Sequence, residues 1–228
     1  MSRLSERAER TPPSGIRRFF EIAEEMDDVV SLGVGEPDFS APWPARKAAI
    51  DALERGQTSY TSNRGRRDLR EAIAAHVTRY GHDYDADDEI LVTTGVSEAM
   101  DLAMRALVDP GDVVAVAEPA YISYGPDASF AGGEVLRVPT RAEDEFRLTY
   151  DALERAGAER ADLLVLCYPN NPTGAVMDAS GFAEVAEFAR EHDLFVLSDE
   201  VYAALTYEGE HDSIATQPGM RERTVVFN

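Results

Sequence analysis

The sequence predicts a three-layer α/β protein, in which helices cover both faces of a mainly parallel sheet. Apolar runs without polar alternation, such as 163–168 and 194–197, are typical of strands that are buried on both faces. A helical segment at 178–191 joins these two runs, so together they form one βαβ unit. Two further apolar runs, 113–117 and 134–138, flank another helical segment and extend the same pattern.

The sequence of the first part of the chain predicts mostly helices. Residues 1–13 are polar, and we expect a mobile arm there. A helix is expected over 14–23, where apolar residues share one face, and a short strand over 29–32. Helices are also expected over 45–55, which prolines precede and a glycine follows, and over 67–80, which ends at a glycine.

The later part of the chain alternates between strands and helices. An apolar strand is expected at 89–93, and the glycine turn after it leads into a helix that stops before Asp109. Two glycines end a helix expected over 121–131, and a shorter helix is expected over 149–156. The β-branched run within 224–228 predicts a last strand.

Polar residues follow the two strands of the βαβ unit. Asn171 comes after the first strand, in the loop Pro169–Gly174, and Asp199 ends the second strand. Ligands of open α/β sheets bind just beyond the carboxyl ends of the strands. We therefore expect Asn171 and Asp199 to project into one crevice. The alternative for each residue taken alone is ordinary turn chemistry, with Asp199 capping a turn.

The two motifs together resemble a known family. Asn171-Pro172-Thr173-Gly174, followed by Ser198-Asp199-Glu200-Val201-Tyr202, resembles the class I/II aminotransferases of fold type I, in particular the aspartate and aromatic enzymes. The resemblance covers about 14–228 and implies the N-terminal portion of a pyridoxal phosphate (PLP) enzyme. It divides the chain into an N-terminal arm with a substrate loop (1–40) and a truncated PLP-binding large domain (41–228), with the small domain missing.

The chemistry of PLP explains the residue types at these strand ends. PLP catalysis needs a protonated pyridine nitrogen, and a carboxylate beside that nitrogen favours the charged ring. By the resemblance, Asp199 supplies that carboxylate. The phenolic oxygen of the ring needs neutral donors, for which Asn171 and Tyr202 are suited.

The resemblance assigns further cofactor contacts. A glycine turn that opens a helix offers free N–H groups and a positive dipole end to a phosphate. In this sequence the turn contains Gly95, Val96 and Ser97, and Val96 replaces a glycine of the more familiar versions. Tyr121 matches an aromatic residue that stacks on the cofactor ring, and Tyr60 matches a tyrosine that crosses a dimer interface to the phosphate of the neighbour's cofactor.

The resemblance also implies a substrate site. Gly33-Val34-Gly35 fails the dinucleotide fingerprint, because Asp38 stands where that fingerprint needs a third glycine. The segment is similar instead to the family's loop beside the substrate carboxylate. There the Gly35 amide, with Asn171, would contact the carboxylate, and glycine permits the close approach of the backbone.

The catalytic residue of the family is not found in this sequence. The resemblance implies a Schiff-base lysine just after Asn228, whereas the only lysine of the chain, Lys47, lies in an early helix and is expected to be solvated. Arginine cannot replace a lysine amine, because its pKa is too high and its nitrogens are poor nucleophiles. We therefore expect this chain alone to be inactive, with exposed core surface and poor solubility.

Composition narrows the class of partner. The 43 acidic and 22 basic residues give a formal charge of −21, which repels nucleic acid and anionic membranes. An excess of acidic residues combined with a single lysine resembles the composition of proteins from salt-accumulating microbes, so folding is expected to need high salt. No signal peptide or membrane-length apolar run is present, and the single Cys167 favours the cytoplasm. The four histidines are scattered, so no metal site is predicted.

Several functions remain open at this stage. The leading hypothesis is PLP-dependent transfer of an amino group between an amino acid and a 2-oxo acid by a homodimer. A PLP-dependent β-lyase or synthase on the same fold would share every residue named above. A non-enzymatic alternative is the aminotransferase-like sensor domain of a regulator, which the acidic charge disfavours. A nucleotide-binding α/β domain ranks lower, since its glycine motifs are absent from the sequence.

Overall fold

The computed structural model describes residues 3–11, 22, 35 and 39–228. The chain divides into two compact units, one of Met1–Thr11 with Arg67–Asn228 and the other of Pro12–Arg66. The helix expected over 14–23 and the strand expected over 29–32 lie outside the described residues, apart from single positions. The predicted domain boundary after residue 40 stays a prediction.

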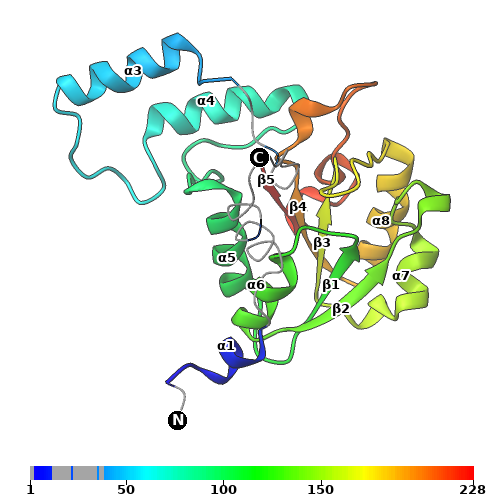
Figure 1. Cartoon of the computed structure of the whole chain (residues 1–228). Helices are drawn as coiled ribbons and strands as arrows, with labels where there is room; N and C mark the ends of the chain where they lie inside the picture. The colour runs from blue at the N-terminus through cyan, green and yellow to red at the C-terminus, as the bar shows by residue number, and fades with distance from the viewer. Residues whose placement is uncertain (1–2, 12–21, 23–34, 36–38) are drawn as a thin grey trace. The chain divides into compact units, whose positions relative to one another are not determined.

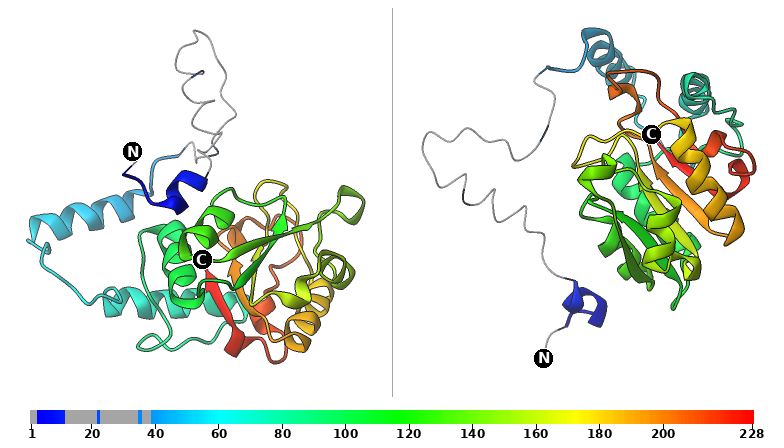
Figure 2. Two further views of the ribbon diagram at one scale, coloured as in Figure 1. Left: turned by 90° about the horizontal axis from the view of Figure 1, so that it is seen from below. Right: turned by 90° about the vertical axis from the view of Figure 1, so that its right-hand side faces the viewer.

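The larger unit is built on one five-stranded sheet (Figure 1). The strands are β1 (Val113–Glu118), β2 (Glu134–Pro139), β3 (Leu163–Cys167), β4 (Phe195–Asp199) and β5 (Thr224–Phe227). Their order is β2-β1-β3-β4-β5, and every neighbouring pair is parallel. β5, drawn red in Figures 1 and 2, forms one edge of this sheet. The predicted parallel sheet is therefore confirmed.

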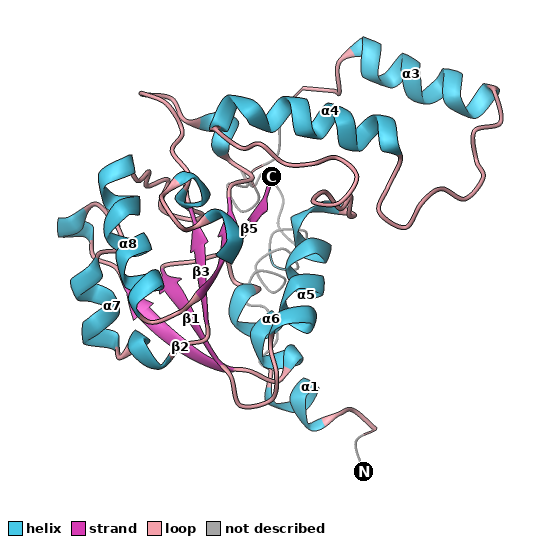
Figure 3. Ribbon diagram, turned by 180° about the vertical axis from the view of Figure 1, so that it is seen from behind, coloured by secondary structure: helices cyan, strands magenta, loops and turns pink. Residues whose placement is uncertain are grey.

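Helices cover both faces of the sheet, as Figure 3 shows. One face carries α5 (Gly95–Leu107) and α6 (Tyr124–Ala131), and the other carries α7 (Tyr150–Ala156) and α8 (Ala179–Glu191). Successive strand residues point to opposite faces. In β4, accordingly, Val196 packs in the core beneath α7 and α8, whereas Leu197 packs in the core beneath α5 and α6. The predicted three layers are confirmed.

Shorter elements complete the description. They are α1 (Glu6–Arg10), α4 (Arg67–Val77), η1 (Thr78–Tyr80), η2 (Ala142–Asp144), η3 (Ala158–Arg160), η4 (Ala203–Leu205), η5 (Ile214–Thr216) and η6 (Arg221–Arg223). In the smaller unit, α3 (Trp43–Glu54) forms where a helix was expected. The sequence motifs for helix ends hold at α7 and α8, which Thr149 and Asp178 cap through side-chain oxygens.

A short helix replaces part of the expected mobile arm. Ser5 caps α1 by accepting a hydrogen bond from the Ala8 amide, at 3.3 Å. The Arg7 guanidinium donates to the Phe130 carbonyl at 2.8 Å, which attaches α1 to the end of α6. A capping serine followed by acidic residues is a helix-start signal, and it outweighs the polar composition here.

One predicted strand is absent among the described residues, and one predicted helix boundary is wrong. Residues 89–93 form no strand, because they pair with none of the described strands and an apolar run becomes a strand only by pairing. Ile90 is nevertheless buried, whereas Leu91 is exposed. The helix expected from Tyr121 begins instead at Tyr124, so that Tyr121 lies in the preceding turn.

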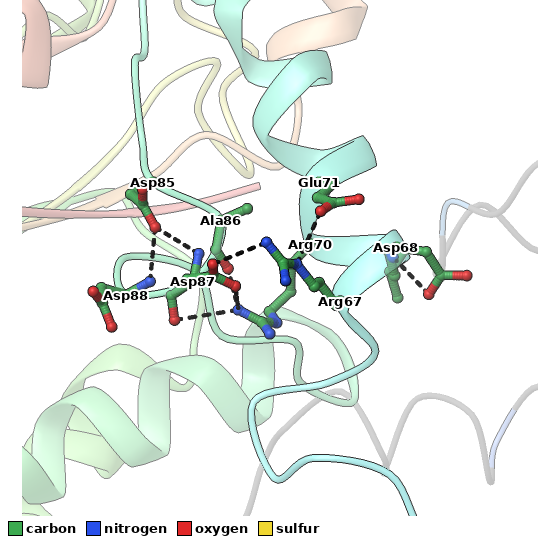
Figure 4. Close-up of polar contacts among 9 residues, drawn as sticks. Arg67, Asp68, Arg70, Glu71, Asp85, Ala86, Asp87 and Asp88 are labelled. Atoms are coloured by element: carbon green, nitrogen blue, oxygen red, sulfur yellow. Dashed lines mark hydrogen bonds and ion pairs between the residues drawn. The ribbon is translucent and has the colours of Figure 1, made fainter.

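An arginine holds the connection between α4 and α5 (Figure 4). The buried Arg70 donates to the carbonyls of Ala86 and Asp87, and Arg67 lies 3.2 Å from the Asp87 carboxylate. Asp85 accepts hydrogen bonds from the Asp87 amide at 2.6 Å and from a second amide in the same turn. The turn at 85–88 is thereby fastened to the first turns of α4.

Candidate active site

A cavity of about 220 Å³ lies beyond the carboxyl end of β4. Side chains from the first turns of α5, the turn before α6, the loop after β3 and the end of β4 line it. They are Val96, Ser97, Met100, Tyr121, Ser123, Tyr124, Asn171, Asp199, Val201 and Tyr202. Six of the predicted site residues therefore share one cavity, although their elements are far apart in the sequence.

Asp199 supplies a buried carboxylate to this cavity. It is 5% exposed, and its Oδ2 accepts a hydrogen bond from the Tyr124 hydroxyl at 2.6 Å. Its Oδ1 accepts from the Val201 amide at 3.2 Å. Burial raises the pKa of Asp199 above its ordinary value, while the hydrogen bonds from Tyr124 and Val201 oppose that rise. Within the described part of the chain no cationic side chain forms an ion pair with Asp199.

Tyr124 was missed at the level of the sequence. Burial, together with the charge of the nearby Asp199 carboxylate, raises the pKa of the Tyr124 hydroxyl, so the hydroxyl stays protonated and remains a donor. Its ring meets the Tyr121 ring edge to face, with the centroids 5.7 Å apart. Tyr121 lies in the turn before α6 and Tyr124 is the first residue of that helix, so local helix periodicity could not have paired the two rings.

The loop after β3 carries Asn171. The Asn171 amide donates to the Tyr202 hydroxyl at 3.4 Å, so the two residues proposed to contact the phenolic oxygen of the ring lie together. The preceding residue, Asn170, fixes the loop by accepting from the amide and hydroxyl of Thr173, at 3.1 and 2.9 Å, and by donating to the Pro119 carbonyl. Asn170 is thus a positioning residue that the sequence motif did not single out.

The start of α5 meets the cavity through Val96 and Ser97. First-turn N–H groups have no carbonyl partner within a helix, and the dipole is positive there. Gly95 has φ of 76°, a conformation that favours glycine. Gly95 itself does not line the cavity, and the Glu98 carboxylate accepts from the Thr94 amide beside it.

Two predicted site residues belong to the smaller unit. Gly35 and Tyr60 are both exposed there, so their assigned contacts with substrate and cofactor stay predictions. Lys47 belongs to α3 of the same unit, where its ammonium lies 2.7 Å from the Asp51 carboxylate. Among the described residues, no group of three histidine, cysteine or acidic side chains is arranged to hold a metal ion.

The family of the chain follows from comparison with known proteins. The family Aminotransferase class I and II matches residues 27–227. The chain belongs to this family. The aminotransferase match runs through the loop after β3, the end of β4 and the cavity between them.

Individual aminotransferases agree along nearly the whole chain. The aspartate aminotransferase of Pyrococcus abyssi is 42% identical, over 99% of this chain and 58% of its own length. The aromatic-amino-acid aminotransferase 2 of Thermococcus litoralis is 40% identical, over 99% and 58%. The solved structure of Thermus thermophilus aspartate aminotransferase with maleate superposes with a TM-score of 0.91 at 37% identity, over 99% of this chain and 60% of that one. The chain thus spans about three-fifths of these relatives.

The cavity fits the cofactor of the family, which is PLP. A buried carboxylate without a cationic partner in the described structure suits a protonated pyridine nitrogen, because the ring would supply the missing positive charge. The Tyr121 ring borders the same cavity, and the start of α5 suits a phosphate.

No described helix combines the length and the apolar character that crossing a lipid bilayer requires.

Proposed function

We propose that the protein is an aminotransferase that uses PLP to move an amino group between an amino acid and a 2-oxo acid. One observation carries the proposal: the buried Asp199 carboxylate shares a cavity with the hydrogen-bonded pair Asn171 and Tyr202. Those residues supply the two kinds of group that the PLP ring needs, an anion at its nitrogen and donors at its phenolic oxygen.

Seven of the residues that line the cavity have a part in this chemistry. Bound PLP supplies a pyridine ring that withdraws electrons from the substrate. Asp199 holds the proton on the ring nitrogen, and the Tyr124 hydroxyl keeps Asp199 ionised and oriented. Asn171 and Tyr202 donate to the phenolic oxygen, Tyr121 packs against the ring, and the amides of Val96 and Ser97 hold the phosphate.

Further parts of the proposal come from the family. Gly35 and Asn171 contact the substrate carboxylate, and Gly95 lets the backbone turn into α5 beside the phosphate. The protein works as a homodimer in which Tyr60 reaches the cofactor phosphate of the neighbouring subunit. We place it in the cytoplasm, since its only cysteine is a buried, free thiol.

The 228-residue chain by itself is proposed to lack activity. Amino transfer needs an amine that bonds the cofactor aldehyde and shuttles a proton. Lys47 is the only lysine, and an aspartate already pairs with it on the exposed helix α3. After incubation with PLP and borohydride, mass spectrometry should find Lys47 unmodified. An adduct at Lys47, or measurable transamination, would contradict this expectation.

The carboxylate assignment is tested by measuring PLP affinity. Asp199→Asn keeps the shape of the side chain but removes the charge that holds the ring proton. A charge-assisted hydrogen bond contributes about 1.5–3 kcal/mol, so we expect the dissociation constant of PLP to rise about ten- to hundredfold.

Asp193→Asn is the matched control. Asp193 has the same chemistry but lies before β4, at the opposite end of that strand, where its side chain is 91% exposed and pairs with Arg223. Its φ of 54° also suits asparagine, so the fold is kept. Equal PLP affinity for the wild type and both variants would refute the assignment of Asp199.

The proposed reaction is tested with the full-length product of the gene. Incubation with PLP, 2-oxoglutarate and candidate amino acids should yield glutamate and the matching 2-oxo acid. Release of ammonia and pyruvate without glutamate would indicate a β-lyase instead.

A further inference from the structure

Glu200 directly follows the last residue of β4, and its side chain lies on the opposite side from that of Asp199. Alternation along the strand sends Leu197 and Asp199 toward α5 and α6, and sends Ser198 and Glu200 the other way. Glu200 is 1% exposed and does not line the cavity. It therefore lies behind the candidate active site, joined to Asp199 by a single peptide bond.

Four buried donors enclose the Glu200 carboxylate. The hydroxyls of Ser198 and Ser213 donate to Oε1 at 2.9 and 2.5 Å. His82 and His211 each approach Oε2 through Nε2, at 3.3 and 2.9 Å. Since an ionised carboxylate only accepts, both of these Nε2 atoms carry a hydrogen. We call these five residues the Glu200 cluster.

The cluster keeps Glu200 charged. Burial alone would raise its pKa, but the hydrogen bonds from His211, His82 and Ser213 outweigh burial and lower the pKa to about 2. Glu200 is thus ionised at neutral pH, where its carboxylate only accepts hydrogen bonds.

The cluster joins segments that are distant in the sequence. His82 follows η1 and lies 118 residues before Glu200, whereas His211 and Ser213 precede η5. The His82 ring stacks on Tyr84 at 5.4 Å, and the Arg221 guanidinium lies 5.5 Å from the centre of the Tyr84 ring. The Tyr80 ring meets the His211 ring edge to face at 5.3 Å.

The backbone of Glu200 is fixed as well. Its amide donates to the Phe227 carbonyl of β5 at 2.8 Å, and its carbonyl accepts from the Asn228 side chain at 3.4 Å. Side-chain and main-chain contacts therefore leave the residue after Asp199 little freedom.

We propose that the Glu200 cluster is a positioning device that sets the place of the Asp199 carboxylate in the cavity and of Tyr202 beside it. It acts from behind the site, through the backbone, and touches no reacting atom. As far as it concerns the cofactor, the proposal rests on the function proposed above.

Two readouts test the cluster, one with PLP and one without. Glu200→Gln keeps the volume of the side chain but turns an amide N–H toward the two histidine N–H groups. We expect PLP to bind about tenfold more weakly, since a displaced contact loses charge-assisted hydrogen bonding. We also expect Cys167 to react about tenfold faster with a thiol reagent. This buried thiol is the register partner of Asp199 on β3, so its reactivity reports local opening.

Paired variants separate positioning from a general loss of stability. Thr149→Ala removes the N-cap of α7, away from β4, and should leave both readouts at the wild-type value. His211→Gln keeps an N–H donor for Glu200 and should leave both readouts near the wild-type value. His211→Leu removes that donor and should behave like Glu200→Gln.

The outcomes are distinct. Wild-type PLP affinity and wild-type Cys167 reactivity in Glu200→Gln would overturn the proposal. Equal acceleration of the Cys167 reaction in Glu200→Gln and Thr149→Ala would overturn it too. If the wild type itself binds no PLP, the proposed function fails for this chain, and the Cys167 rates alone decide whether the cluster positions β4.

Discussion

Tyr124 governs the state of Asp199 at the scale of single residues. Its hydroxyl contacts Oδ2 at 2.6 Å, and this hydrogen bond opposes the rise in the Asp199 pKa that burial causes. A carboxylate that is buried without a cation is costly unless donors satisfy it. Tyr124 and the Val201 amide are the donors that the structure provides.

Tyr124→Phe should destabilise the protein by about 1–3 kcal/mol, because it leaves one oxygen of a buried carboxylate unsatisfied. The pKa of Asp199 is higher in the folded than in the unfolded protein. The contribution of Asp199 to the free energy of unfolding is therefore lost as pH rises through the folded-state pKa. Losing a donor raises that pKa further. The deficit in the free energy of unfolding should therefore be larger near about pH 8 than near about pH 4, as urea titrations can show.

Tyr121→Phe is the matched control for that experiment. Tyr121 is 38% exposed, and the change again removes one hydroxyl from a ring beside the cavity. An equal loss in both variants at every pH would contradict a specific role of the Tyr124 hydroxyl.

At the scale of elements, capping decides where the helices on the α7 and α8 face begin. Thr149 accepts from the Ala152 amide at 3.2 Å, and Asp178 accepts from the Gly181 amide at 2.9 Å. Hydrogen bonds from Gly181 and Ser180 lower the pKa of Asp178. This carboxylate therefore stabilises α8 at any pH above its unfolded-state pKa. The contribution is lost as pH falls through the lower, folded-state pKa.

Thr149→Ala should lower the free energy of unfolding by about 1 kcal/mol, the usual cost of a lost N-cap. Thr149→Ser keeps the hydroxyl and should retain most of the stability. Urea unfolding of the three proteins at neutral pH measures both effects. A serine variant as unstable as the alanine variant would show that the methyl group, and not the cap, stabilises α7.

At the scale of the whole molecule, the net negative charge is the main feature expected to make stability depend on salt. The formal charge of −21 implies self-repulsion that salt screens, with a Debye length of about 10 Å at 0.1 M and about 3 Å at 1 M. Described ion pairs such as Arg223–Asp193 and Arg160–Glu134 are exposed, so they offset little of it.

The melting temperature should rise by about 5 °C or more between about 0.1 M and about 2 M KCl, because screening favours the compact state. NaCl at equal ionic strength should act alike if screening is the cause. A melting temperature that stays flat across this range would count against dependence on salt.

The sequence by itself determined the layers, the strands from β1 to β5 and the residues at their carboxyl ends. Unbroken apolar runs and capped helices are local patterns, and parallel strands bring Asn171 and Asp199 to one edge. Tertiary structure alone decided the partners of the two neighbouring carboxylates. Asp199 meets Tyr124 from 75 residues away, and Glu200 meets His82 from 118 residues away. Pairing also decided that 89–93 is no strand. Hydrogen-bond partners and strand neighbours depend on where the chain returns in space, and local periodicity does not contain that information.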